Sequence, residues 1–261
     1  MYPAVFSTAF SGIKFICQQF YKKEMLEMNS FLVALIMVLV FTMIFGRFFC
    51  GFACAFGTYG DAIYGAGTWM RKKRKEKPFS LSEGITGKLK YLKYIVLLVI
   101  VLICVAGKAE YVNNNSVWSV FSQLQAGKFL TTGNMVGIIL LLVITVGMVL
   151  EKRFFCRFLC PMGAVFSLLP VIPLFGVKRD RENCINRCQA CKNKCPAGIV
   201  LPSTEEGDNA QMGECFSCGK CMEICPKGNV HIGMPFIKGN ENWIQIIKAV
   251  ILLSLCYLLK V

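Results

Sequence analysis

The chain has 261 residues, 55% of them hydrophobic, and a formal net charge of +14. With a positive mean hydropathy of +0.55, this composition excludes an ordinary soluble domain of the same length and favours a membrane protein. The charge does not indicate nucleic-acid binding, because the basic residues gather at the ends of apolar segments, as they do in membrane proteins.

Three apolar segments are predicted to cross the membrane as helices. Residues 28–46 and 129–150 contain no charged residue, and each is long enough to cross a hydrocarbon core of ~30 Å. The segment 91–107 is shorter, with Tyr91 and Tyr94 expected at the membrane interface. Residues 3–20 are also apolar, but Gly12 and Lys14 interrupt them, and we assign no element there.

The basic residues predict how these segments are oriented. Arg71–Lys77 reads RKKRKEK, whereas the loop Lys108–Lys128 contains no basic residue besides its two ends. The positive-inside rule therefore predicts that the first loop is cytoplasmic and the second is outside. Basic residues after 150 predict that the cysteine-rich segment also faces the cytoplasm.

An internal repeat lies within the predicted membrane domain, residues 1–178. The sequence GRFFCGFACAFG at 46–57 recurs as KRFFCRFLCPMG at 152–163, at an offset of 106 residues. The repeat units are about 28–74 and 134–180. Because the span in each unit is predicted to run from outside to inside, we expect a parallel repeat about a pseudo-twofold axis along the membrane normal.

Each copy of the repeat contains a pair of cysteines four residues apart. Residues at this spacing share one face of a helix, so two such pairs around one axis would supply four thiolates for an additional iron–sulfur cluster. A redox-active dithiol, copper(I) binding and simple packing are the alternatives. Nearby Arg47, Arg153 and Arg157 are expected either to offset thiolate charge or to bind lipid phosphate. The predicted metal ligands are Cys50, Cys54, Cys156 and Cys160.

Eight further cysteines fall in two runs within a predicted α+β domain, residues 179–238. The second run reads CxxCxxCxxxCP, the spacing of two-cluster bacterial ferredoxins, in which the fourth cysteine of each run binds the other cluster. The first run differs by opening CxxxC, and structural zinc is disfavoured because each run supplies four cysteines alone. Two [4Fe–4S] clusters are predicted, one on Cys184, Cys188, Cys191 and Cys225 and the other on Cys215, Cys218, Cys221 and Cys195.

Other cofactors receive no support from the sequence. The chain has one histidine, His231, which excludes a bis-histidine haem, and it contains neither a CxxCH motif nor a glycine-rich dinucleotide fingerprint.

The remaining segment, residues 239–261, is predicted to form either a fourth span or an amphipathic helix on the membrane surface, because Lys248 interrupts its apolar run. The fold class is therefore mostly α, a multi-pass helical membrane domain with a small two-cluster domain.

The paired cysteine motifs followed by a two-cluster domain resemble the membrane-bound polyferredoxin family typified by NapH and NosR, over residues 28–228. One departure is Ala55, which stands where the family usually has proline. The family usually also has a helix before the first cysteine-bearing span, so the resemblance implies that the protein's start lies upstream.

This resemblance implies an electron-carrier subunit of an oxidoreductase system in the cytoplasmic membrane. Its donor would be a cytoplasmic ferredoxin or a quinol-linked protein, and its acceptor an extracytoplasmic flavoprotein or reductase. Membrane lipid and a larger complex are the other implied partners, and nucleic acid is not one. The alternatives are copper binding and reduction, as in the relative CcoG, and a redox-sensing regulator.

Overall fold

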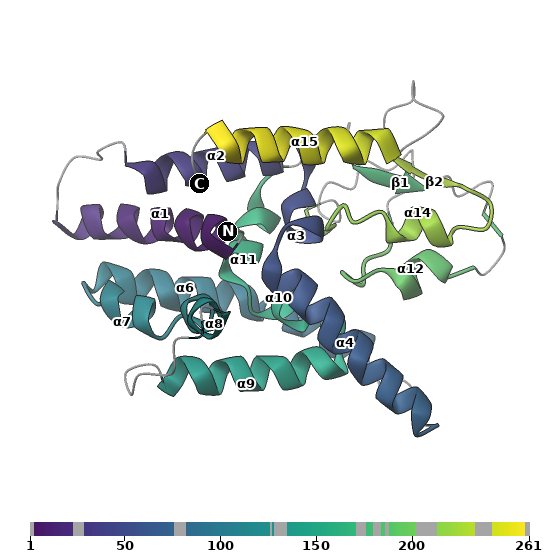
Figure 1. Ribbon diagram of the computed structural model, residues 1–261, viewed down its shortest axis with the longest axis horizontal. Helices are drawn as coiled ribbons and strands as arrows, with labels where there is room; N and C mark the ends of the chain where they lie inside the picture. Colours follow the sequence, from purple (N-terminus) through teal and green to yellow (C-terminus); the bar gives the residue numbers. More distant parts are fainter. Residues whose placement is uncertain are drawn as a thin grey trace. The chain divides into compact units, whose positions relative to one another are not determined.

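The computed structural model describes residues 3–22, 29–75, 82–125, 127, 135–170, 176–179, 184–185, 188–201, 213–232 and 242–258. These residues are mostly helical, with one two-stranded sheet (Figure 1). The chain divides into two compact units. The first unit comprises Met1–Ile36 and Cys54–Ala164, and the second comprises Met37–Ala53 and Val165–Val261.

Helices build the first unit. They are α1 (Pro3–Lys22), α4 (Ala55–Lys73), α5 (Glu83–Leu89), α6 (Leu92–Val105), α7 (Ala109–Asn114), α8 (Val117–Gln125), α9 (Met135–Leu150), α10 (Phe154–Phe158) and the first half of α11 (Pro161–Leu168). In this unit α4 packs against α9, and α1 against α6. Gly67 permits the first contact, since a Cβ there would lie 2.9 Å from Cγ1 of Val149.

The second unit combines short helices with the sheet. Its elements are α3 (Phe48–Phe52), β1 (Val177–Arg179), α12 (Ala190–Lys194), α14 (Lys220–Ile224), β2 (Val230–Ile232) and α15 (Asn242–Leu258), while α2 (Ser30–Phe45) is divided between the units. The antiparallel strands pair Val177 with Ile232 and Arg179 with Val230. Figure 1 shows them beside α12 and α14. Strand β1 begins at Val177, two residues before the boundary at 179 that was predicted for the cysteine-rich domain.

The predicted membrane spans correspond to α2, α6 and α9, but each helix is shorter than its prediction. Positive φ angles at Gly46 (70°), Gly107 (79°) and Arg153 (47°) follow the three helices, and this left-handed conformation does not continue a right-handed helix. Among the described residues, no helix is both long and apolar enough to cross a membrane. The segments predicted as spans at 28–46, 91–107 and 129–150 thus contain the shorter helices Ser30–Phe45, Leu92–Val105 and Met135–Leu150, with 28 and 129–134 outside the described residues.

The two copies of the repeated motif form the same succession of elements. Helix α3 covers Phe48–Phe52 and α10 covers Phe154–Phe158, an offset of 106 residues, and α4 and α11 begin at Ala55 and Pro161 with the same offset. In each copy a short helix therefore ends before the second cysteine, and a new helix begins directly after it. Helix α1, which was not predicted from the sequence, precedes both copies.

Candidate metal centre

Four cysteines from the two runs line one small cavity in the second unit. Cys195 comes from the first run, and Cys215, Cys218 and Cys221 come from the second. Cys195 ends α12 in an extended conformation (φ −63°, ψ 121°), directly before Pro196. These are the four residues that the spacing of the runs assigned to one cluster.

Left-handed residues shape the loop that carries the second run. Ser217 has a φ of 49° and Gly219 a φ of 72°, immediately before α14 begins at Lys220. The two positions reverse the chain around Cys218, so that Cys215 and Cys221 reach the same cavity. Serine is not a usual left-handed residue, and its side chain is buried here.

Burial determines the protonation of these thiols. Desolvation raises the pKa of Cys215 to about 12, although a hydrogen bond from the backbone N–H of Ser217 to Sγ, 3.4 Å long, acts in the opposite direction. Desolvation and neighbouring cysteines also raise the pKa of Cys221. Binding iron to Cys215 and Cys221 therefore displaces their protons.

The second predicted ligand set is only partly gathered. Cys191 and Cys225 both pack against a core of Val177, Leu201 and Val230. Sγ of Cys225 accepts a hydrogen bond of 3.3 Å from the backbone N–H of Asn229. Cys184 and Cys188 do not line the cavity of the first set, and residues 180–183 and 186–187 beside them lie outside the described residues.

The chemistry of the cavity fits an iron–sulfur cube. Within the described ranges, no three or more Cys, His, Asp or Glu side chains converge closely enough to hold a single ion. A [4Fe–4S] cube instead takes one thiolate at each of four corners, and it separates the sulfurs further than one ion does. Four cysteines around one cavity, with the backbone N–H of Ser217 directed at Sγ of Cys215, match that requirement.

The paired cysteines of the repeat are arranged differently from the prediction. Cys50 lies in α3 and Cys156 in α10, whereas Cys54 and Cys160 follow the ends of these short helices. The two members of a pair therefore do not share one helix face, because the helix ends between them. The four cysteines are also divided between the units, with Cys50 in the second and the other three in the first.

Cys54 and Cys160 have equivalent local surroundings. The pKa of Cys54 is raised by burial, while hydrogen bonds from the backbone N–H groups of Gly57 and Phe56 and the charge of Arg153 lower it. Sγ of Cys160 accepts a 3.3 Å hydrogen bond from the N–H of Gly163, three residues later. Both sulfurs thus sit at the N-terminus of a helix, where the helix dipole favours a thiolate.

Two of the neighbouring arginines pair with acids. Nε and Nη2 of Arg153 donate to the two carboxylate oxygens of Asp61, at 3.0 and 2.9 Å. Nη1 of Arg157 donates to Glu151 at 2.5 Å. Their charges are neutralised within the first unit.

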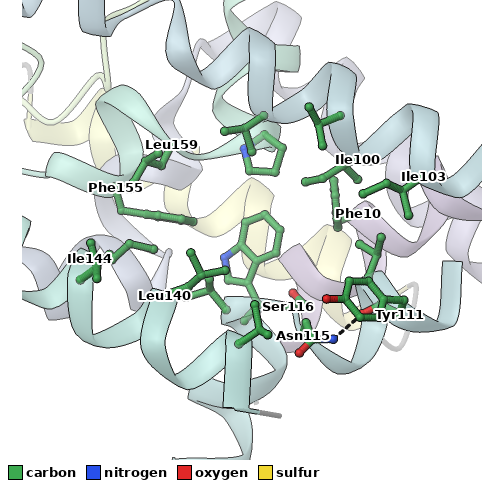
Figure 2. Close-up of a pocket in the computed structure, with 18 of the residues that line it drawn as sticks. Phe10, Ile100, Ile103, Tyr111, Asn115, Ser116, Leu140, Ile144, Phe155 and Leu159 are labelled. Carbon is green, nitrogen blue, oxygen red and sulfur yellow. Dashed lines mark hydrogen bonds between the residues drawn. The ribbon is translucent and has the colours of Figure 1, made fainter. Parts of the chain in front are cut away.

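An apolar cavity of about 480 Å³ lies in the first unit, and the sequence did not indicate it. Figure 2 shows Phe155 and Leu159 on one side, with Tyr111, Asn115 and Ser116 together on the other. Nδ2 of Asn115 donates to the carbonyl oxygen of Tyr111 at 3.1 Å. The cavity is therefore apolar with a polar edge, and Phe155 and Leu159 connect it to the second cysteine pair.

Comparison with known families agrees with this chemistry. A family model described as a 4Fe-4S binding domain matches twice, at residues 30–77 and 134–179. A model described as a 4Fe-4S dicluster domain matches residues 183–230. The chain is thus an iron–sulfur protein of the electron-transfer class.

Individual relatives identify the family. "Uncharacterized protein MJ0749" of Methanocaldococcus jannaschii is 32% identical over 156 residues, covering 60% of this chain and 52% of the relative. MJ0750 of the same organism is 31% identical over 173 residues, covering 65% of each. "Ferredoxin-type protein NapH" of Escherichia coli is 27% identical over 164 residues, covering 60% of this chain and 53% of the relative.

Proteins named NosR also match, and the chain belongs to the NapH/NosR-type polyferredoxin family. The matched regions span between about half and two thirds of the length of the first two relatives. No solved structure matches the chain.

Proposed function

We propose that this chain is a membrane-bound electron carrier with two [4Fe–4S] clusters in its cysteine-rich segment. One cluster is held by Cys195, Cys215, Cys218 and Cys221, and the other by Cys184, Cys188, Cys191 and Cys225. The single observation that supports this proposal most strongly is the cavity lined by Cys195 together with three cysteines of the other run. Exchange of the fourth ligand between runs is the signature of a two-cluster ferredoxin.

The residues around the sulfurs have distinct tasks in this mechanism. The clusters supply one-electron redox chemistry, and the protein holds them and tunes their potential. The N–H groups of Ser217 and Asn229 donate to Sγ of Cys215 and Cys225, which stabilises negative charge on sulfur. Buried Phe216 and Leu201 exclude water from the ligand set of Cys215.

Metal analysis of anaerobically purified protein tests this function. We expect about eight irons and eight sulfides per chain from two cubes, with the EPR signals of reduced [4Fe–4S] clusters. A Cys221→Ala variant loses one cluster, whereas Cys17→Ala, a cysteine outside both runs, keeps both. Zinc in place of iron, or equal iron in wild type and Cys221→Ala, would contradict the proposal.

We further propose that the chain resides in the cytoplasmic membrane, multi-pass, with its helices arranged as a parallel repeat and the cysteine-rich segment facing the cytoplasm. Exposed apolar side chains on α6 and α9 support this location: Leu98, Leu102, Leu142 and Val146 are each 58–62% exposed. Soluble proteins rarely expose continuous apolar faces of this kind, and lipid would cover them. Membrane fractions washed with alkaline carbonate should retain the protein, and its release by the wash would contradict the location.

Of the two donors that the resemblance implies, the cavity of the first unit favours a quinol-linked one. Its volume of about 480 Å³ lies in the range of small-molecule sites. Its apolar walls suit a ring and an isoprenoid tail, and Asn115 and Ser116 at the polar edge (Figure 2) suit a ring oxygen. Electrons would pass from this donor through the clusters to an extracytoplasmic acceptor, such as a flavoprotein, in a larger complex.

Filling the cavity tests the donor. Leu140→Trp is expected to abolish binding of a short-chain quinone analogue while leaving the iron content unchanged, because Leu140 lines the cavity. Leu142→Trp is the matched control, since Leu142 is 62% exposed and is not part of the lining. Equal binding by both variants would contradict a quinol site here.

A further inference from the structure

Helix α3 makes a close contact with the loop that carries the second cysteine run, within the second unit. A Cβ at Gly51 would lie 2.5 Å from the carbonyl oxygen of Phe216 and 3.5 Å from Cα of Cys218. A distance under 3.0 Å to a backbone atom is not tolerated, so glycine permits this approach. The RFFC motif of the first copy therefore lies against the cavity of Cys195, Cys215, Cys218 and Cys221.

Arg47 stands one helical turn before Gly51 and belongs to the same contact. The N–H of Gly51 donates to the carbonyl oxygen of Arg47 at 3.2 Å. The Arg47 side chain is 1% exposed, and its Nη1 lies 3.6 Å from Oε2 of Glu214, the residue before Cys215. Its Nε and Nη2 have no hydrogen-bond partner among the described residues.

Leaving such donors unsatisfied is costly. A buried cation whose donors are unpaired destabilises a fold. Glu214 forms an ion pair with Nη1 of Arg47 at 3.6 Å, which offsets part of this cost but leaves Nε and Nη2 without an acceptor among the described residues. A negatively charged group in the adjacent cavity would offset the rest.

A second buried cation lies near the same cysteine. Lys248 of α15 is 1% exposed, and its Nζ lies 5.9 Å from the ring centroid of Phe48, the neighbour of Arg47. Lys248 also interacts electrostatically with Cys215, and the charge of Arg47 lowers the pKa of Cys215 against the larger upward effect of burial. The Cys215 corner is thus next to two cations.

The other copy of the motif lacks this arrangement. Arg153, the counterpart of Arg47 at the offset of 106 residues, has both carboxylate oxygens of Asp61 as acceptors. At the position of Gly51 the second copy has Arg157, which pairs with Glu151. Arg153 thus has two hydrogen bonds to one carboxylate, whereas Arg47 has an ion pair with Glu214 and keeps two donors without an acceptor among the described residues, next to the cysteine cavity.

We propose that Arg47 and Lys248 are positioning residues that stabilise the reduced form of the cluster on Cys195, Cys215, Cys218 and Cys221. This inference rests on the proposed function. Each cluster gains one electron on reduction, and nearby buried cations favour the more negative state because the dielectric constant around them is low. The cluster beside α3 therefore has a higher reduction potential than the same cluster without the two cations.

An EPR-monitored redox titration of the full-length, cluster-loaded protein tests the proposal. At the midpoint potential of the wild-type cluster, we expect Arg47→Gln to lower the ratio of reduced to oxidised cluster about tenfold, equivalent to ~59 mV for one electron. Lys248→Met lowers the ratio in the same direction. Arg47→Lys keeps the charge and restores most of the ratio.

Arg153→Gln is the matched control, and we expect its ratio to stay within twofold of wild type. Iron content is measured for every variant, and Lys248→Met carries the test if Arg47→Gln fails to fold. An unchanged ratio in loaded Arg47→Gln and Lys248→Met would overturn the inference alone, as would an equal shift in Arg153→Gln. Wild-type protein without iron would instead overturn the proposed function, and this inference with it.

Discussion

The two copies of the repeated motif form the same elements but have different surroundings. Both place FFC in a five-residue helix that follows the arginine, with a second cysteine just before the next helix. In the first copy, Gly51 brings α3 against the carbonyl of Phe216, and Arg47 is buried beside Glu214 without a close acceptor. In the second copy, Arg153 and Arg157 are both paired with carboxylates.

This difference teaches that sequence identity within a repeat preserves local structure more than it preserves chemistry. The side chains of Arg47 and Arg153 are similarly buried, but only Arg153 has a bidentate carboxylate partner, whereas Arg47 has a single longer contact with Glu214. One substitution, glycine for arginine at the position of Gly51, separates a motif that approaches the cysteine loop from one that does not. The four predictions below test which copy serves the metal centre and which serves the fold.

The largest effect is expected from a cysteine of the cavity. Cys215→Ala removes one of four ligands from the site beside the first copy, so the protein should lose about four of its eight irons. Iron and sulfide analysis after anaerobic purification measures this loss. Cys17→Ala, in α1, is the control and should retain full iron. Full iron in Cys215→Ala would disprove the assignment of this ligand.

A second prediction concerns Cys54 and Cys160, which occupy equivalent positions in the two copies. If the repeat holds a further cluster, as the sequence predicts, wild-type protein contains clearly more than eight irons, and Cys54→Ala and Cys160→Ala each remove the excess. Both variants keep the eight irons of the cysteine-rich segment. Eight irons in wild type, unchanged in both variants, would exclude the additional cluster.

The copper content of the purified protein distinguishes a copper-handling function of these cysteines from electron transfer. Soft thiolates bind copper(I), so a copper-handling protein would bind one copper that the same two substitutions abolish. The electron carrier proposed above binds none. Copper bound in proportion to protein, with iron unchanged, would favour the alternative.

Gly51 gives the third prediction, of intermediate size. Gly51→Ala forces the new Cβ against the Phe216 carbonyl, which is backbone and must shift with the loop carrying Cys215 and Cys218. We expect the variant to assemble its clusters but to lose visible iron–sulfur absorption several-fold faster in air. Gly65→Ala, on α4 with no atom within 4 Å of its Cβ, is the matched control. Equal bleaching rates in the two variants would mean that α3 does not support the loop.

The spacing of the cysteines predicts which residues come together in the second unit better than it does for the repeat. The ferredoxin pattern groups Cys195 with Cys215, Cys218 and Cys221, and these four line one cavity in the structure; their role as cluster ligands stays a prediction. The spacing of Cys50 and Cys54 is compatible with one helix, but the backbone leaves the helix at Ala53. Periodicity alone does not reveal such an end.

The partners of the arginines could not be predicted from the sequence, for a different reason. Nothing near Arg153 in the sequence identifies Asp61 as its partner, since 92 residues separate them. The same holds for Arg47 and Glu214, and for the apolar cavity, whose lining comes from α1, α6, α8, α9 and α10 among other segments. Long-range packing determines these features, whereas α2, α6 and α9 were apparent from hydropathy alone apart from their ends.

The smallest effect is expected at the neutralised arginine of the second copy. Asp61→Asn leaves Arg153 buried with a weaker acceptor, and breaking a hydrogen-bonded charge pair of this kind costs about 1–3 kcal/mol, since Asp61 is partly exposed. The thermal midpoint of detergent-solubilised protein should therefore fall by a few degrees. Cluster content and the reduction potential of the Cys215 cluster stay unchanged.

A double-mutant cycle separates the pair from the individual residues. Arg153→Met combined with Asp61→Asn should destabilise the protein less than the sum of the two single variants. Each single variant leaves one charged side chain without its partner, whereas the double variant removes both charges. Additive losses would show that the pair contributes nothing specific to stability. A shift in reduction potential in Asp61→Asn would be the more informative failure: it would mean that the charge of Arg153 also reaches a cluster, and that the two copies of the motif are chemically equivalent after all.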